Sequence, residues 1–361
     1  MSADPGLASW LQLTLTPGLG AAAIRGLLEQ FGLPENILAA PRAQLERVAG
    51  PAAAALQHSE ETAAAVRNAL RWAESPGHAV VTLADAAYPR LLLEIADPPP
   101  LLYAVGRLEL LGRPALAIVG SRNATAQGVR NAEQFARAFS AAGLTIVSGM
   151  ALGIDAAAHA GGLAGEGSTI AVLGTGVDVT YPRQNAALAQ RIAQSGLLLS
   201  EFALGSAGAA HHFPRRNRLI SGLAQGCLVV EAALASGSLI TARAAAEQGR
   251  EVFAIPGSIH SPLAKGCHAL LKQGAKLVES AEDVLAELTA FQRTATASAR
   301  APSPPAADEP LLAHMGFDPV DVDSICARAG LAAERVSAEL LRLELAGRVA
   351  ALPGGMYQRL N

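Results

Sequence analysis

The middle of the chain alternates short, continuous apolar runs with segments of helical periodicity, and this alternation constrains the fold more than any other feature. The apolar runs are Leu116–Gly120, Leu144–Gly149, Thr169–Gly174, Leu197–Glu201, Leu228–Glu231 and Val252–Ile255. Strands that are apolar throughout are buried on both faces, and helical crossovers between them make neighbouring strands parallel. The pattern predicts an α/β fold with an extended, Rossmann-like, doubly wound parallel sheet. An earlier run, His78–Leu83, is expected to extend this sheet.

The first 75 residues show helical periodicity instead. A turn at Thr16–Gly20 precedes Ala21–Phe31, where apolar residues recur at helical spacing. The Gly-Leu-Gly of this turn resembles a helix-hairpin-helix turn, whose amides can contact a phosphate, but it also suits an ordinary turn between two helices. We expect a helical domain over residues 1–75 and the Rossmann-like domain over residues 76–290.

The end of the chain reads as a linker followed by a small domain. Residues 291–309 are rich in proline and alanine, as flexible linkers are. Within residues 310–361, two helices are predicted at Val322–Ala329 and Glu334–Ala346, and Pro353-Gly354-Gly355 predicts a hairpin turn. This order is typical of a winged helix. The glutamates of its second helix favour a protein contact or weak DNA contact over sequence-specific reading of a major groove.

Glycine and small polar residues gather where the predicted strands end. They comprise Gly120, Ser121 and Arg122, then Ser148 and Gly149, then Gly174, Thr175 and Gly176 with Arg183 and Asn185 beyond, and finally Ser236, Gly237 and Ser238 with Thr241. The carboxyl ends of parallel strands lie at one edge of a sheet, where free amides and helix N-termini favour an anion. The sequence lacks both Gly-x-Gly-x-x-Gly after the first strand and a Gly-Lys-Ser/Thr triplet, which argues against a dinucleotide and against ATP hydrolysis.

A basic cluster supplies the strongest indication of a ligand. Phe213, Arg215, Arg216, Asn217 and Arg218 follow one another closely in a chain whose net charge is −3. Arginines at a helix start are often a solvated face, but cations are unfavourable at a helix N-terminus unless an anion lies among them. A guanidinium fork suits phosphate, and an adjacent ring can stack on a base. The cluster therefore favours a nucleic acid as the ligand.

Several titratable side chains near the strand ends would also be compatible with an enzyme. Asp155, His159, Glu201 and Glu231 could act as acids, bases or metal ligands. The alternative is structural, with Asp155 capping a helix, His159 facing a packed helix and the two glutamates pairing with arginines. The three widely spaced cysteines form no zinc pattern and no disulfide framework. We predict no metal, no cofactor and no catalysis, and the lack of a signal peptide or long apolar run predicts a cytoplasmic protein without membrane contact.

The motifs together resemble the DprA family, also called Smf. The resemblance is carried by Gly120-Ser121-Arg122, the runs Ser148–Asp155 and Gly174–Asp178, Tyr181-Pro182, Leu199–Phe202, Phe213–Arg218, Glu231-Ala232, Ser236–Leu239 and Pro256-Gly257-Ser258. They occur in the family's order across the middle domain. The layout is similar to that of longer family members, which have a sterile-alpha-motif-like head and a winged-helix tail.

The resemblance implies a function in natural transformation. Such proteins bind incoming single-stranded DNA, protect it, load the RecA recombinase onto it, and act as homodimers without catalysis. It also implies that Arg122 and the Arg215–Arg218 run hold phosphates, and that Arg183 stands where relatives often carry lysine. If about four phosphates are contacted, the log–log salt slope should be about −3. Two alternatives are a nucleotide-processing hydrolase of the lysine-decarboxylase-like group and a transcription regulator that uses the winged helix.

Overall fold

The computed structural model describes residues 5–56, 60–288, 310–315, 320–345, 348–352 and 355–359. The chain divides into two compact units, Met1–Phe291 and Gln292–Asn361. The predicted linker at 291–309 and the Pro353-Gly354 pair of the predicted hairpin turn lie outside the described residues.

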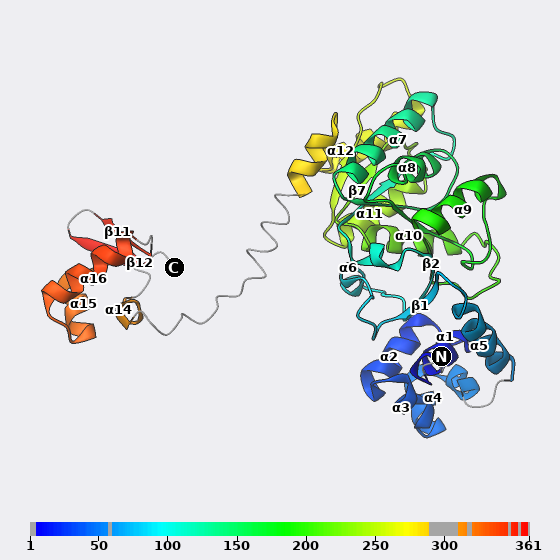
Figure 1. The fold of residues 1–361 in the computed structure, drawn as a ribbon, viewed down its shortest axis with the longest axis horizontal. Coiled ribbons are helices and arrows are strands. Elements are labelled where there is room, and N and C mark those ends of the chain that lie inside the picture. The colour runs from blue at the N-terminus through cyan, green and yellow to red at the C-terminus, as the bar shows by residue number, and fades with distance from the viewer. Residues whose placement is uncertain are drawn as a thin grey trace. The chain divides into compact units, whose positions relative to one another are not determined.

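A nine-stranded sheet forms the centre of the first unit (Figure 1). Its strands are β1 His78–Thr82, β2 Leu101–Gly106, β3 Ala115–Val119, β4 Thr145–Ser148, β5 Thr169–Val172, β6 Leu197–Ser200, β7 Gly226–Val229, β8 Glu251–Ala254 and β9 Lys276–Leu277. In space they follow the order β1-β2-β6-β5-β4-β3-β7-β8-β9. In this spatial order, every pair of neighbouring strands from β6 through β5, β4, β3, β7 and β8 to β9 is parallel. Strand β2 runs antiparallel to both of its neighbours, β1 and β6. The predicted doubly wound sheet is confirmed, and the sequence interpretation missed two of its strands, β2 and the two-residue β9.

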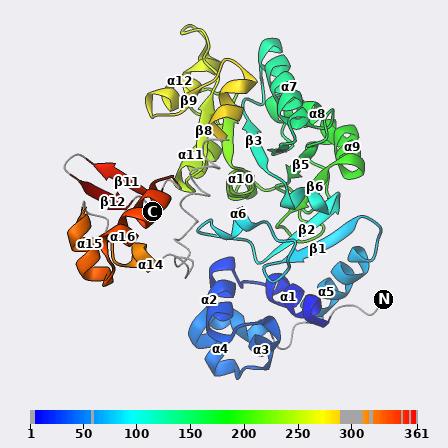
Figure 2. The same cartoon turned by 60° about the vertical axis from the view of Figure 1, so that its left-hand side comes forward.

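Helices cover both faces of this sheet (Figure 2). On one face lie α6 Arg90–Leu93, α10 His212–Gly222, α11 Ser238–Glu247 and α12 Lys265–Lys272, and on the other lie α7 Ala126–Ala141, α8 Ile154–Gly162 and α9 Ala186–Ser195. Strand β3 shows why both faces are apolar. Ala117 and Val119 pack in the core beneath α10 and α11, while Leu116 and Ile118 pack in the core beneath α7 and α8.

The N-terminal helices, which we call the head, belong to the same unit as the sheet. They are α1 Pro5–Leu15, α2 Ala21–Phe31, α3 Pro34–Ala39, α4 Arg42–Ala49 and α5 Glu60–Ala73. Gly18 has φ +79°, which lets the chain reverse between α1 and α2. Trp10 of α1 and Ala69 of α5 share a buried cluster with Tyr103 of β2, and Arg25 of α2 forms an ion pair with Asp97. The head therefore packs directly onto the β2 side of the sheet.

The second unit contains short helices and a three-stranded sheet. Its elements are α14 Pro310–Ala313, β10 Val320–Asp321, α15 Val322–Ala329, α16 Ala333–Leu345, β11 Val349–Leu352 and β12 Met356–Arg359. Asp321 caps α15 by accepting from the Ser324 amide, and Gly330, with φ 65°, ends it. The sheet order is β10-β12-β11. Two helices followed by a β-hairpin agree with the predicted winged helix.

None of the helices described in either unit is both long enough and apolar enough to cross a bilayer.

Candidate nucleic-acid interface

A cavity of about 460 Å³ opens where the order of the sheet reverses. The chain leaves β3 toward β4, β5 and β6 and then returns to place β7 on the other side of β3. The loops after β3 and β7 therefore diverge, and doubly wound sheets bind ligands at this crevice. The lining includes Gly120, Ser121, Arg122, Phe213, Asn217, Ser236, Gly237, Ser238 and Thr241. We call it the switch-point cavity; it unites three predicted clusters that are far apart in sequence.

Arg122 and the half-buried Phe213 line this cavity, and Tyr181 lies beside Phe213. The Arg122 guanidinium carbon is 6.0 Å from the centroid of the Phe213 ring, and the Tyr181 ring centroid is 5.5 Å from that of Phe213. Arg122 is exposed, and so is 52% of Tyr181. A Cβ atom on Gly174 would lie 2.8 Å from the Phe213 ring, so this glycine makes room for the ring rather than for a ligand. Tyr181 was not among the predicted site residues, although it stands in a recognised motif beside Arg183.

Arg216 does not offer its guanidinium group to solvent. The residue is 5% exposed, and its Nη1 donates to the carbonyl oxygens of Gly149 and Val172, at the ends of β4 and β5. Burial lowers its pKa to about 10, an effect that the nearby Asp155 partly offsets. A Cβ atom on Gly149 would lie 2.6 Å from this guanidinium group. Arg216 thus links the ends of β4 and β5. The expectation that all three arginines of the cluster hold phosphates is therefore wrong for Arg216.

Arg218 is also occupied by the protein itself. Its Nη1 lies 2.8 Å from Oε1 of Glu201, and its Nε lies 3.1 Å from Oδ2 of Asp97. Only 15% of the Arg218 side chain is exposed. Arg215 lies 3.0 Å from Oε2 of Glu201, yet 47% of its side chain remains exposed. Within the cluster, Arg215 therefore remains the arginine best placed to meet an external anion.

The two glutamates considered as catalytic groups have structural partners. Glu201 pairs with arginines, as expected, and its side chain is 2% exposed. For Glu231 the expectation of an arginine partner is wrong, because its carboxylate accepts from the amide and the hydroxyl of Thr125, at 2.9 and 2.6 Å. Thr125 is the N-cap of α7. Glu231 therefore links the loop after β7 to the start of α7.

Asp155 and His159 hold the loop that follows β4. Asp155 accepts from the amides of Gly149 and Ala151, and Nε2 of the buried His159 accepts from the amide of Met150. Met150 has φ 62°, a backbone conformation that needs such support. Both residues therefore have structural roles, but not the ones expected: Asp155 holds loop amides and does not cap α8, whose N-cap is Gly153, and His159 contacts Met150 and Thr169 of β5.

Several predicted ligand residues turn out to make internal contacts. The buried Ser148 and Thr175 hydroxyls donate to the carbonyl oxygens of Ile118 and Val179. Asn185 donates to the carbonyl of Met150 at 2.8 Å. None of these three lines the switch-point cavity. Arg183 is exposed, and the described part of the chain gives it no ion pair.

The pKa of His159 gives this loop a testable pH dependence. Burial, helped by Arg216, lowers that pKa to about 3, whereas a histidine in an unfolded chain has a pKa of about 6.5. As the pH falls, the unfolded chain binds the proton first, so stability is lost between these two values. We expect His159 to lower the free energy of unfolding by about 2 kcal/mol between pH ~6.5 and pH ~5. Urea denaturation at both pH values measures this loss. A His159→Asn variant should lose less free energy of unfolding between the two pH values, and an equal loss would show that His159 is not the cause.

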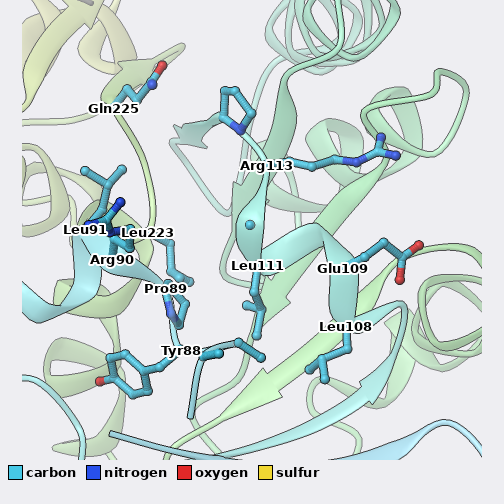
Figure 3. Close-up of a pocket in the computed structure, with 14 residues that line it drawn as sticks. Tyr88, Pro89, Arg90, Leu91, Leu108, Glu109, Leu111, Arg113, Leu223 and Gln225 are labelled. Atoms are coloured by element: carbon cyan, nitrogen blue, oxygen red, sulfur yellow. The ribbon is translucent and has the colours of Figure 1, made fainter. Parts of the chain in front are cut away.

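A larger cavity, of about 550 Å³, lies at the opposite end of the strands. Pro114 and Gln225, which line it, directly precede β3 and β7. Figure 3 shows Arg90 and Leu91 on one side and Glu109 and Arg113 on the other. Ligands of doubly wound sheets bind at the carboxyl ends of the strands. The smaller switch-point cavity is therefore the candidate site. Among the described residues, no group of His, Cys, Asp and Glu side chains is arranged to hold a metal ion.

Comparison with known proteins identifies the family. The sequence matches the family described as DNA recombination-mediator protein A over residues 79–289, and the DprA winged helix domain over residues 295–355. Protein Smf of Escherichia coli (strain K12) is 43% identical, over 82% of this chain and 81% of the relative. Protein Smf of Synechocystis sp. (strain ATCC 27184 / PCC 6803 / Kazusa) is 38% identical, over 98% of each chain.

Two solved structures share the fold at substantial identity. DNA processing protein A of Streptococcus pneumoniae is 41% identical and superposes with a TM-score of 0.67, over 77% of this chain and 95% of that chain. DNA processing protein A of Helicobacter pylori, whose structure was described for its single-stranded DNA binding mode, is 32% identical with a TM-score of 0.54, over 59% and 96%. The family matches span the switch-point loops, nearly all of the sheet and most of the winged helix, and this chain belongs to the DprA/Smf family of DNA recombination mediators.

Proposed function

We propose that this chain binds single-stranded DNA at the switch-point cavity, without catalysing a reaction on it. The observation that carries the proposal is that Arg122 and Phe213 line this cavity together, with Tyr181 beside Phe213. A guanidinium group suits a phosphate, and partly exposed rings suit unpaired bases, which have free faces on which to stack. The Ser236–Ser238 loop, at the start of α11, also lines the cavity and adds hydroxyl and amide groups.

The single-stranded DNA binding of the Helicobacter pylori relative supports this choice of ligand. The hydrolase alternative has less support, because Glu201 and Glu231 are held by arginines and by Thr125. From the family resemblance we further propose that the DNA-bound protein loads RecA and acts as a homodimer in the cytoplasm. The loading step is tested by measuring strand exchange by RecA, with and without this protein, on single-stranded DNA that already carries a single-strand-binding protein.

Salt dependence tests the electrostatic part of the proposal. With Arg216 internal and Arg218 paired, the exposed cations among the predicted site residues are Arg122, Arg183 and Arg215. About three contacts should give a log–log salt slope of about −2 with single strands, shallower than the −3 expected from the full cluster. Fluorescence anisotropy of a labelled oligonucleotide over a salt series measures it, with the same sequence as a duplex for comparison. A slope near zero, or tighter binding of the duplex, would overturn the proposal.

A further inference from the structure

Helix α10 presents one face to the switch-point cavity. Phe213, Asn217 and Ile220 line the cavity, and their spacing of four and three residues places them in one row along the helix. Phe213 lies in the first turn and is half-buried, whereas Ile220 is 1% exposed and lies at the buried end of the row. Asn217 lies between them, about 6 Å along the helix axis from Phe213. A base that stacks on Phe213 with its edge turned inward therefore meets the Asn217 amide.

A neighbouring guanidinium group fixes the direction of this amide. The Nε of Arg216 donates to Oδ1 of Asn217 at 3.2 Å, and Arg216 is itself held by the carbonyl oxygens of Gly149 and Val172. A guanidinium group has donors only, so it keeps the amide oxygen, and not the amide nitrogen, on its own side. Within the part of the chain that the structure describes, no group accepts from Nδ2 of Asn217. Both of its N–H donors are therefore available to a ligand.

The other polar side chains of the cavity do not choose between a donor and an acceptor on a base. The Asp155 carboxylate is an acceptor, but it is directed at two backbone amides of the loop after β4. The serine and threonine hydroxyls that line the cavity can each donate or accept. Asn217 is therefore the lining residue whose fit depends on which base enters.

We propose that Asn217 gives the switch-point cavity a base preference, for thymine and guanine over cytosine and adenine. The inference rests on the proposed function and adds specificity to it. Thymine O4 and guanine O6 are acceptors that match the Nδ2 donors, whereas cytosine and adenine carry an amino group, which is itself a donor, at the corresponding position. Two donors that face each other both lack a partner, and this opposes binding. Phosphate contacts are the same for every base, so the preference is added to a general affinity.

Oligo(dT) and oligo(dC) of equal length test this preference in the full-length protein. Both are pyrimidine strands with the same backbone, and they differ in the carbonyl or amino group that the proposal invokes. Fluorescence anisotropy at one salt concentration should show oligo(dT) bound about three- to tenfold more tightly, and Asn217→Ala should remove the difference. Tight binding of both strands by the wild type with no preference would overturn the role of Asn217 alone. Weak binding of both would instead refute the proposed function.

Asn217→Asp gives the sharper test. Aspartate has nearly the shape of asparagine, keeps an oxygen toward Arg216, and replaces the donor nitrogen by an acceptor. Its charge lowers the affinity for both strands, but the preference should invert, with oligo(dC) bound about three- to tenfold more tightly than oligo(dT). The ratio of the two affinities does not depend on a loss common to both strands, such as partial unfolding. A variant that still prefers oligo(dT) would overturn the proposal.

Asn123→Asp is the matched control. Asn123 is exposed on the loop after β3 and lines the same cavity, so the variant adds the same charge away from the α10 face. We expect a lower affinity for both strands and an unchanged ratio. If Asn123→Asp also inverted the ratio, charge in the cavity and not the Asn217 amide would set the preference. If Asn217→Ala weakened both strands equally, the amide would contact a phosphate, and the proposal would be wrong.

Discussion

Arg122→Glu is expected to reduce affinity for single-stranded DNA by about a hundredfold at low salt, and Arg122→Ala by about tenfold. Arg122 is exposed, lines the switch-point cavity and lies beside the Phe213 ring. Alanine removes a charge-assisted contact to phosphate, and glutamate adds repulsion in the same place. Because Arg122 supports no internal contact of the kind that Arg216 makes, the thermal midpoint should not change. Anisotropy titrations with several unrelated sequences measure the effect, which should be similar for all of them.

A charge reversal elsewhere on the same domain provides the comparison. Arg137 lies on α7, its side chain is 62% exposed, and among the described residues its ion pair is with Glu133 four residues earlier. Arg137→Glu should leave DNA affinity within about twofold of wild type. If both reversals weakened binding equally, net charge alone would account for it. If Arg122→Glu weakened binding to one sequence only, the residue would be reading a base.

The second large effect concerns folding. Arg216→Met should lower the free energy of unfolding by about 3–5 kcal/mol, because it leaves buried groups without their partner. The carbonyls of Gly149 and Val172 would lose their donor, and Asp155 would lose its nearest compensating charge. Arg183→Met, at an exposed position, should change stability by less than about 0.5 kcal/mol. Chemical denaturation measures both. An Arg216→Met protein of normal stability that fails to bind DNA would show that its guanidinium group contacts the ligand.

Much of the fold could be predicted from the chain because buried parallel strands have a simple pattern. The runs at β3 to β8 are apolar throughout, and each is followed by a helix. Strand β2 was missed although Leu101–Gly106 is apolar, because it follows three prolines and only the four-residue α6 lies between it and β1. Strand β9 was missed because it has only two residues. An antiparallel strand joined by a loop lacks the βα alternation on which the interpretation depended.

The site was predictable only in part, since sequence shows which residues are near a helix start but not which way each points. Arg215 and Arg216 are adjacent, yet one is 47% exposed at its side chain and the other is buried. Two distant features decide this difference. Gly149 leaves the space that Arg216 fills, and Glu201, from the end of β6, attracts Arg215 and Arg218. Neither partner lies within ten residues, so local pattern could not reveal them.

The fit of Arg216 against Gly149 has a consequence for how this protein can change. A methyl group at position 149 would occupy the space of the guanidinium group, and a shorter residue at 216 would leave a void and two carbonyls without donors. Each single replacement is therefore harmful by itself, while a larger residue at 149 combined with a shorter one at 216 refills the space and leaves only the loss of the two hydrogen bonds. Positions 149 and 216 should therefore coevolve: in proteins that evolve from this one, both residues should be substituted together or neither.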